Sequence, residues 1–573
     1  MARGRASDFV QHLAARFEEM KAQRAPFDDV WRKVAVFESE RMNLFDGQRG
    51  QQDTWLAMRR DPRDIDNTAR QAITVFSSGM LSGVSPPSDQ WFSLRVADRS
   101  GGDDLRKWRP VAAWLESVET MFARDFTAKN FYTQQVSSYK HIGMYGMQAM
   151  FVGSSPEIGT YYRDIPPDEI FIGNDFAGRV NVVFRELNIT LQQAIAMFGR
   201  ENLSETVQAV INNKYFKPFD LVRIIHAVIK KDPGYENILG GNSLPYASYY
   251  FEPGEDHLVN EGGFESLPYI VTRAYSDGRS PYSISPGTIA LADVLMVNEI
   301  KKLMLRAGQL SVAPPMLMPD RGLVGRMNYA ESAINLFRKD GTTSVDDFKP
   351  LQLVGEFKLG MDILERAQKD INTAFFVDLF LMIHNRTQAG RGTPTAMEIE
   401  QLATEKSFLL APILVNQQQE NFNRLFERVF ELKRNEPGAL PPAPRELDGA
   451  DIEIDYISPL VRAQQGVKTQ QMLQGLNDVG MVAQLYPDIM DILDIDATTR
   501  KIVENRGVPQ SCIRTLEEVA QIREQRARQQ AAMQQQMQQQ QVLQGAMAGY
   551  EGLSKAPEQG SPVRRLMAQA SGA

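Results

Sequence analysis

Two stretches without Pro or Gly decide the fold: TIALADVLMVNEIKKLMLRA at Thr288–Ala307 and MDILERAQKDINTAFFVDLFLMIHNRTQA at Met361–Ala389. Apolar residues recur at helical spacing in both, and this spacing predicts two long amphipathic helices. In the first stretch the apolar stripe is Ile289, Ala292, Leu295 or Met296, Ile300 and Leu303. In the second it is Met361, Leu364, Ala367, Ile371 and Phe375.

The segment between these helices, Gly308–Gly360, contains many residues that interrupt regular structure. They are Pro314, Pro315, Pro319, Gly322, Gly325, Gly341, Pro350 and Gly355. Such spacing predicts a small module of turns and short elements at the tip of a helix pair. This arrangement suits a subunit that packs side by side in a ring, and taken alone it also fits an ordinary helical hairpin.

Length and composition describe a chain with room for several domains. The 573 residues are 43% hydrophobic and 23% charged, with a net charge of −8. Because nucleic-acid affinity comes from Lys and Arg neutralising phosphates, this acidic balance argues against coating DNA with the whole surface. The single cysteine, Cys512, leaves no intrachain disulfide. We expect neither a signal peptide at the MARGRASDF start nor a membrane span.

The N-terminal half predicts helices followed by a β-rich domain. A helix is expected over Ser7–Phe45 with a break at Pro26, and all five Trp residues fall within the first 114 positions, which predicts one packed layer. Between Met150 and Tyr275 we expect a small β domain interrupted by a helix at Leu191–Phe198. Its strands are predicted at Ala149–Gly153, Val180–Glu186, Leu221–Lys230, Tyr246–Glu252 and Tyr269–Ala274.

The C-terminal half is predicted to be mainly helical. Thr393-Pro394 and Thr395 with Glu398 offer start signals for a helix that runs past a kink at Pro412 to about Arg434. The Pro437–Pro444 linker ends it, and one strand is expected at Ile452–Ile457. Arg514–Gln544 lacks Pro and Gly, which predicts a long helix that either packs against copies of itself or frays. A flexible tail, Gly545–Ala573, is expected to follow.

Motifs for catalysis and metal binding are absent from the sequence. No Gly-Lys pair occurs, so a Walker A loop is excluded, and no Gly-x-Ser-x-Gly elbow is present. The histidines are scattered without zinc-ligand spacing, so we expect ordinary surface or core residues: His12, His141, His226, His257 and His384. The acidic run Asp488, Asp491, Asp494 and Asp496 lacks the EF-hand pattern and is interpreted as a solvated helix face with a capping Asp. No cofactor, metal or catalytic residue is predicted.

Six ordered segments resemble the portal, or head-to-tail connector, protein of short-tailed, podovirus-type double-stranded DNA bacteriophages. They extend along the chain to about Arg528. The segments are DNTARQAITVFSSGMLSGVSPPSDQWFSL from Asp66, YSDGRSPYSISPG from Tyr275, INTAFFVDLF from Ile371, TPTAMEI from Thr393, YISPLVRAQ from Tyr456 and GVPQSCIRTLEEV from Gly507.

The resemblance implies an α+β portal fold and a ring of about twelve subunits at one capsid vertex. Double-stranded DNA would enter through this ring during packaging and leave through it at infection. The implied parts are a wing (1–282), stem helix 1 (283–306), a clip (307–357), stem helix 2 (358–378), a tunnel loop (379–395), a wing helix and strand (396–457), crown helices (458–544) and a flexible tail (545–573).

The resemblance also implies partners and a place. The partners would be the terminase, a tail adaptor, and the major capsid and scaffolding proteins. The protein would belong to the virion, assembled in the host bacterial cytoplasm, without stable membrane insertion.

An acidic ring would conduct DNA without holding it. Twelve copies at −8 give a charge of about −96, a repulsive background against which local cations position the duplex. The candidates for DNA contact are Arg386 and Arg391 in the loop, with Lys301, Lys302, Arg306, Arg366 and Lys369 on the stem. For Arg366 and Lys369, ion pairing between subunits is the alternative.

Two other classes remain as alternatives. A packaging enzyme such as a nuclease or motor subunit should show a Walker motif or clustered carboxylates, and neither is visible. Another structural component, such as a tail adaptor or scaffold, would not explain a clip-sized module between two long helices.

Overall fold

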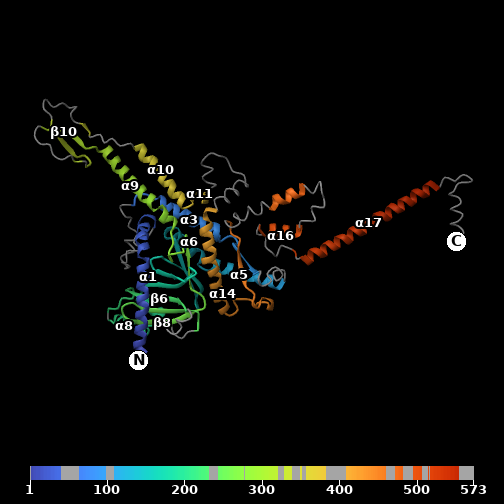
Figure 1. Ribbon diagram of the computed structural model, residues 1–573, viewed down its shortest axis with the longest axis horizontal. Helices are drawn as coiled ribbons and strands as arrows, with labels where there is room; N and C mark the ends of the chain where they lie inside the picture. Colours follow the sequence, from blue (N-terminus) through green and yellow to red (C-terminus); the bar gives the residue numbers. More distant parts are fainter. Residues whose placement is uncertain are drawn as a thin grey trace, which may run out of the picture. The chain divides into compact units, whose positions relative to one another are not determined.

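The computed structural model describes residues 2–39, 64–97, 109–213, 215–231, 243–276, 278–320, 328, 330–338, 349–350, 357–381, 408–459, 472–481, 494–505, 514 and 516–553. The chain divides into two compact units, Met1–Leu473 and Gln474–Ala573. The first unit contains helices and four sheets (Figure 1). The predicted α+β class is confirmed.

A five-stranded antiparallel sheet forms the centre of the β-rich region. Its order is β4 (Ile170–Asn174), β5 (Val180–Thr190), β6 (Leu221–Lys230), β7 (Tyr246–Glu252) and β8 (His257–Phe264). Two short helices, α7 (Leu191–Phe198) and α8 (Glu205–Ile211), are inserted between β5 and β6. The bounds predicted for β6, β7 and α7 are confirmed, whereas β4, β8 and α8 were missed.

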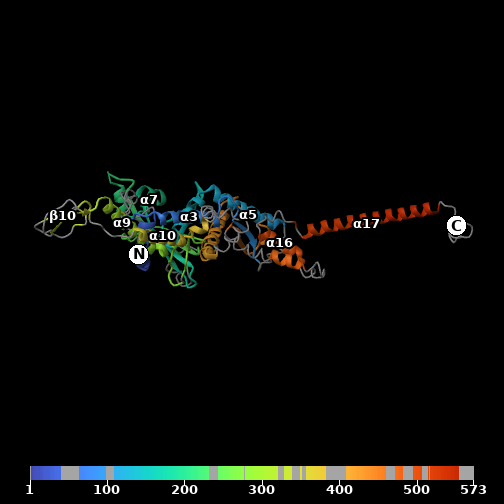
Figure 2. The ribbon, with the colours of Figure 1, turned by 90° about the horizontal axis from the view of Figure 1, so that it is seen from above.

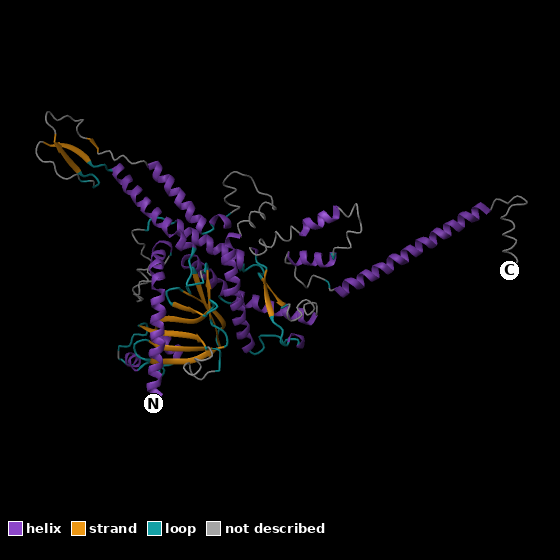
Figure 3. Cartoon of the chain, viewed as in Figure 1, coloured by secondary structure: helices purple, strands orange, loops and turns teal. Residues whose placement is uncertain are grey.

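A second, three-stranded antiparallel sheet lies beside helix α6 (Phe131–Tyr145). Its order is β3 (Gly159–Ile165), β2 (Met147–Ser155) and β9 (Tyr269–Arg273). β2 and β9 match predicted strands, while β3 was not predicted. Figure 3 shows the strands of the first unit gathered mainly in this region, next to α1 (Ala2–Glu38).

Helix α1 runs without interruption through Pro26, so the predicted break is wrong. A proline removes one helix hydrogen bond, but tertiary packing on both sides of Pro26 holds the helix together. Before Pro26, Phe17 packs against Phe171, with 4.9 Å between the ring centroids. After it, Trp31 is buried in the main core. The predicted end at Phe45 lies outside the described residues, since the described helix stops at Glu38.

Between these two contacts, the buried Arg24 ties α1 to the start of β4. Its Nη1 donates to the carbonyl oxygens of Pro167 (3.0 Å) and Ile170 (2.8 Å). These bonds fix the middle of α1 against the sheet on the N-terminal side of Pro26.

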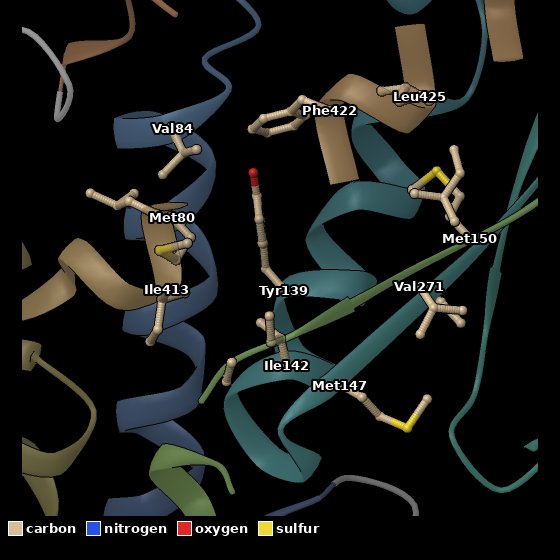
Figure 4. Packing of buried hydrophobic residues seen from close by; sticks show 14 of the residues in the cluster. Met80, Val84, Tyr139, Ile142, Met147, Met150, Val271, Ile413, Phe422 and Leu425 are labelled. Carbon is tan, nitrogen blue, oxygen red and sulfur yellow. The ribbon is translucent and has the colours of Figure 1, made fainter. Parts of the chain in front are cut away.

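The main core joins helices α3 (Thr68–Val84) and α6, sheet strands β2 and β9, and a long helical segment at 408–435. Figure 4 shows Met80, Tyr139, Ile142 and Phe422 converging from these elements. Three tryptophans are buried, Trp31, Trp91 and Trp114, which confirms the predicted N-terminal packing for them. Trp55 and Trp108 lie outside the described residues.

The 408–435 segment contains a π-helical turn, Gln417–Phe422, and continues as α14 (Asn423–Asn435). The helix passes through Pro412, and its irregularity lies after that residue. Its end before the Pro437–Pro444 linker is as predicted. Strand β13 (Ile452–Tyr456), also predicted, pairs antiparallel with β1 (Phe92–Val96), and α5 (Arg109–Ala128) packs on β1. The helix starts predicted at Thr393–Thr395 lie outside the described residues.

Two long helices, α9 (Pro286–Val312) and α10 (Phe357–Ala374), lie side by side in both views (Figure 1, Figure 2). In the sequence between α9 and α10, the chain forms a small three-stranded sheet. Its strand order is β11 (Ile334–Arg338), β10 (Met316–Asp320) and β12 (Lys349–Pro350). The predicted helix pair and its small intervening module are thus present.

The second helix is shorter than predicted. α10 ends at Ala374 because Phe376 adopts a left-handed conformation (φ 57°), and a one-turn helix, α11 (Val377–Phe380), follows. α11 packs against α3, where Phe380 lies so close to Gly79 that a β-carbon there would clash with its ring. This contact explains why α10 ends at Ala374 although the following sequence contains no Pro or Gly before Gly390.

In the second unit, α16 (Ile495–Asn505) and α17 (Leu516–Leu553) are the two longest described elements. Asp494 accepts a hydrogen bond from the backbone N–H of Ala497 (2.9 Å), which confirms the interpretation of this residue as a helix cap. Arg523 pairs with both carboxylate oxygens of Asp496. α17 continues through Gly545 to Leu553, so the expected start of a flexible tail at Gly545 is wrong.

No helix among the described residues combines the length and apolar character that crossing a membrane requires.

Candidate functional site

The candidate site is the α9–α10 pair, and α9 begins at a well-defined cap. The Ser285 hydroxyl accepts from the backbone N–H of Thr288 (2.7 Å), and Pro286 occupies the first turn. Gly287 follows because a β-carbon there would lie 2.9 Å from the carbonyl oxygen of Met144 and even closer to Glu38. The start of α9 is therefore anchored in the main core.

Helix α9 buries a different face from the predicted one. Ala290, Val294 and Val297 are buried against the rest of the chain. The predicted stripe faces outward, with Ile289 58%, Met296 40% and Leu303 55% exposed. Both sets fit helical spacing, so periodicity shows that α9 is apolar on two faces but cannot tell which one is covered. We define the exposed stripe of α9 as Ile289, Ala292, Met296 and Leu303.

For α10 the predicted face is confirmed near the core. Ala367, Ile371 and Phe375 are buried. Met361, one end of the predicted stripe, is half exposed because it lies toward the β10–β12 module, beyond the body of the core. The fully buried apolar residues of α10 therefore lie in its core-side half.

Asp66, at the start of α3, ties both helices together. Its carboxylate accepts hydrogen bonds from the backbone N–H of Thr68 (2.7 Å), from Gln368 Nε2 on α10 (3.0 Å) and from Lys301 Nζ on α9. The side chain of Asn298 on α9 accepts from the backbone N–H groups of Ile65 (2.7 Å) and Asp66 (2.9 Å). We call Asp66, Asn298, Lys301 and Gln368 the stem node.

The electrostatics of the stem node favour a charged Asp66. Burial alone would raise the pKa of this carboxyl, but the hydrogen bonds from Lys301 and Thr68 and the charge of Lys301 outweigh it, so the pKa is lowered. Lys301, predicted as a DNA contact, is thus committed to a partner within the chain. Its role in this structure is to fix α9 against α3.

The other predicted cations of the helix pair are exposed. Lys302 pairs at 3.5 Å with Glu299. Within the described part of the chain, Arg306, Arg366 and Lys369 have no ion-pair partner. Arg386 and Arg391 lie outside the described residues.

The helix pair is close to neutral overall. α9 contains three basic and two acidic residues, a net charge of +1, and α10 contains three of each, a net charge of zero. Asp293 on α9 has a raised pKa, from burial and from the nearby charge of Asp370 on α10. Such a surface offers separate positive points rather than a continuous basic track.

The sequence did not point to Asp66, Asn298 or Gln368 as members of a common site. One signal was available: Asn298 is a polar residue on a helix face otherwise formed by Val294 and Val297. An amide in that position needs a hydrogen-bond partner, but the partner's identity depends on the tertiary fold.

Histidine and metal chemistry add nothing to the site. Among the described residues no group of three His, Cys, Asp or Glu side chains is placed to hold a metal ion. His226 is buried, stacks on Tyr250 and bonds Tyr269 Oη (2.6 Å), and burial lowers its pKa to about 3. This confirms a core role for that histidine; His384 lies outside the described residues.

An α+β chain with an anchored helix pair, an exposed apolar stripe and isolated surface cations has the features of an assembly subunit. The chain belongs to the bacteriophage head to tail connecting protein family, whose profile matches residues 10–513.

Two curated relatives and one solved structure are similar to this chain. The portal protein of Salmonella phage epsilon15 is 28% identical over 544 residues, covering 94% of each chain. The probable portal protein of Bordetella phage BPP-1 is 28% identical over 531 residues, covering 90% of each. A chain from the neck of an empty GTA particle is 11% identical, with a TM-score of 0.29, over 72% of this chain and 87% of that one.

Proposed function

We propose that this chain is a portal protein, a homo-oligomeric ring at one capsid vertex through which double-stranded DNA is packaged and ejected. Family membership and the names of two relatives that match at least 90% of the chain support this assignment. The structural observation that carries it is the second apolar face of α9.

A helix that is apolar on two faces needs a partner for each. Within the chain, α9 buries Ala290, Val294 and Val297, while the exposed stripe of α9 has no cover among the described residues. Packing this stripe against another part of an identical copy gives a heterologous contact, and such contacts close into rings when the rotation permits. About twelve copies is the number proposed.

The parts of the chain take the roles expected of a portal. α9 and α10 form the stem around the channel, the β10–β12 module forms the clip, and the β-rich region with the 408–435 helix forms the wing. The tunnel loop is the part of the 379–395 segment that follows α11, because residues 379–380 belong to that packed helix, and the C-terminal helices form the crown.

DNA would be positioned by separate cations in a repulsive channel. Arg306, Arg366 and Lys369 are the exposed stem candidates, with Lys302 partly engaged by Glu299 and Lys301 withdrawn into the stem node. Arg386 and Arg391 remain the loop candidates. Phosphate contacts of this kind are independent of base sequence. For Arg366 and Lys369, ion pairs with a neighbouring copy are the second proposed role.

The proposed partners are the terminase, a tail adaptor, and the major capsid and scaffolding proteins. The proposed location is the virion, after assembly in the host cytoplasm. The role is structural, without catalysis. The alternative functions are another structural head-tail component, such as a tail adaptor, and, less favoured, a packaging enzyme.

Native mass spectrometry of the purified chain tests the ring. We expect one dominant closed species of about twelve subunits, and a chain that stays monomeric at micromolar concentration contradicts the proposal. Changing both Arg386 and Arg391 to Ala tests the channel. The ring should persist while the amount of DNA packaged falls, and a full genome packaged by the double variant would remove the loop from the DNA path.

A further inference from the structure

An aromatic side chain stands in solvent at the tip of the β4–β5 hairpin. Phe176 is fully exposed (103%), the largest value among the described large hydrophobic residues. Leaving a phenyl ring in water forgoes the free energy that its burial would release. A ring this exposed is better explained by a partner than by the fold of one copy.

The turn that presents Phe176 is rigid. Asp175 Oδ1 accepts hydrogen bonds from the backbone N–H groups of Ala177 (2.9 Å) and Arg179 (2.8 Å). Gly178 takes the left-handed conformation that the turn requires (φ 78°). Its carbonyl oxygen accepts from Arg273 Nη2 (2.8 Å), which ties the tip to β9. The turn therefore holds the phenyl ring of Phe176 outward, and docking this ring to a partner would cost little further backbone conformational entropy.

The same chain contains an apolar cavity of about 160 Å³ between α1 and the start of α9. Ile284, at its mouth, is 51% exposed, and Trp31 is buried in its wall. The rings of Phe27 and Trp31 lie 6.0 Å apart and offer edges and faces to an incoming ring. The cavity is lined by Pro26, Phe27, Val30, Trp31, Ser283, Ile284 and Thr288.

The size of the cavity fits a phenyl ring. The cavity is open to solvent on the side of Ile284, and its volume is similar to that of an enclosed apolar cavity, about 150 Å³, that binds benzene. The tyrosine among the exposed aromatics, Tyr215, would bring a hydroxyl that a largely apolar cavity leaves poorly paired.

Phe176 does not fill the cavity of its own chain, because its side chain is fully exposed to solvent. The cavity is therefore open to a side chain from another copy.

We propose that Phe176 of one copy inserts into the cavity formed by Phe27, Trp31 and Ile284 of the adjacent copy. This inference depends on the proposed function, because the inserted side chain comes from a neighbouring subunit of the proposed oligomeric ring. A knob and a hole at separate places on one chain define a heterologous contact, the type that builds rings. Thr288, in the lining of the cavity, directly precedes Ile289, the first residue of the exposed stripe of α9.

Cross-linking between two single-cysteine chains tests the contact. With Cys512→Ser as background, one chain carries Phe176→Cys and the other Ile284→Cys, and the two are coexpressed and treated with a short bismaleimide. Only neighbouring copies can then be joined. We expect a covalent dimer from this pair and none when Tyr215→Cys replaces Phe176→Cys as the control.

The outcomes separate the contact from the ring. Rings that form without the Phe176–Ile284 cross-link, or that cross-link only through Tyr215, overturn the contact and leave the ring intact. If no ring forms, the proposed function fails as well.

A second variant, Phe176→Ala, removes the phenyl group and should leave the fold of the subunit unchanged. Phe176→Ala should leave the thermal midpoint of the dissociated subunit unchanged, because the side chain packs against nothing there. It should raise the concentration at which rings dissociate by about tenfold or more. Tyr215→Ala is the matched control and should not change that concentration. Equal ring stability for Phe176→Ala and wild type would overturn the proposal.

Discussion

At the scale of single residues, the stem node shows how one buried carboxylate fixes two long helices. Asp66 meets α9 through Lys301 and α10 through Gln368, and Asn298 completes the connection through the backbone. Sequence reasoning placed Lys301 on the DNA path because its charge was visible and its partner was not. An ion pair between residues so far apart in the sequence follows only from the tertiary fold.

Replacing Asp66 with Ala tests this node. The change leaves Lys301, Gln368 and the backbone N–H of Thr68 without their acceptor, so we expect a loss of about 1–3 kcal/mol in the free energy of unfolding. Lys302→Ala, on the adjacent exposed position, should cost no more than about 0.5 kcal/mol. Urea denaturation of both variants makes the comparison, and equal midpoints would show that the node contributes little.

A second residue, Glu38, gives stability a pH dependence. Its carboxyl group is buried, neither oxygen has a hydrogen-bond partner among the described residues, and burial raises its pKa well above the ordinary value. The folded state therefore keeps a proton that the unfolded chain releases above about pH 4.3. Stability falls as pH rises from that value toward the folded-state pKa.

Glu38→Gln should remove this dependence. We expect the variant to unfold at a higher temperature than wild type at pH 8, with the difference shrinking toward pH 4, where both side chains are neutral. A difference that is the same at both pH values would contradict the buried-acid explanation.

At the scale of elements, α9 and α10 were predictable in existence but not in orientation. A breaker-free run with helical spacing is a strong local signal, and both helices are present. The prediction of the buried face of α9 was wrong because this helix has two apolar stripes. Only packing against α1, α6 and α10 selects between them. The end of α10 was missed because the close approach of Phe380 to Gly79 is a tertiary contact. Pro26 inside α1 shows the same override of a local rule by packing.

Substituting two isoleucines, one on a buried helix face and one on an exposed face, distinguishes the stability of the subunit from that of the ring. Ile371→Ala, in the core, should cost about 2–5 kcal/mol in the stability of the subunit. Ile289→Ala, on the exposed stripe of α9, should leave the isolated subunit nearly unchanged and weaken the ring instead. Thermal unfolding and native mass spectrometry of both variants check this. An Ile289 variant whose rings are as stable as wild type would show that the stripe is not an interface.

At the scale of the whole molecule, order along the chain was more predictable than the site. The β-rich region, the helix pair with its insert and the long C-terminal helix follow from local patterns, and six ordered motifs pointed to the family. The exposed Phe176 and the cavity behind Ile284 left no sequence signal, because exposure at a turn and an unfilled space between α1 and α9 are properties of the folded chain. The net charge of −8 was available from composition and, in the proposed ring, would give the channel a repulsive background.

The most direct measurement of the central claim is an electron-microscope image of the purified full-length chain at micromolar concentration. The proposed function predicts closed rings with a central hole and about twelve-fold symmetry. Compact single subunits without a hole would contradict it.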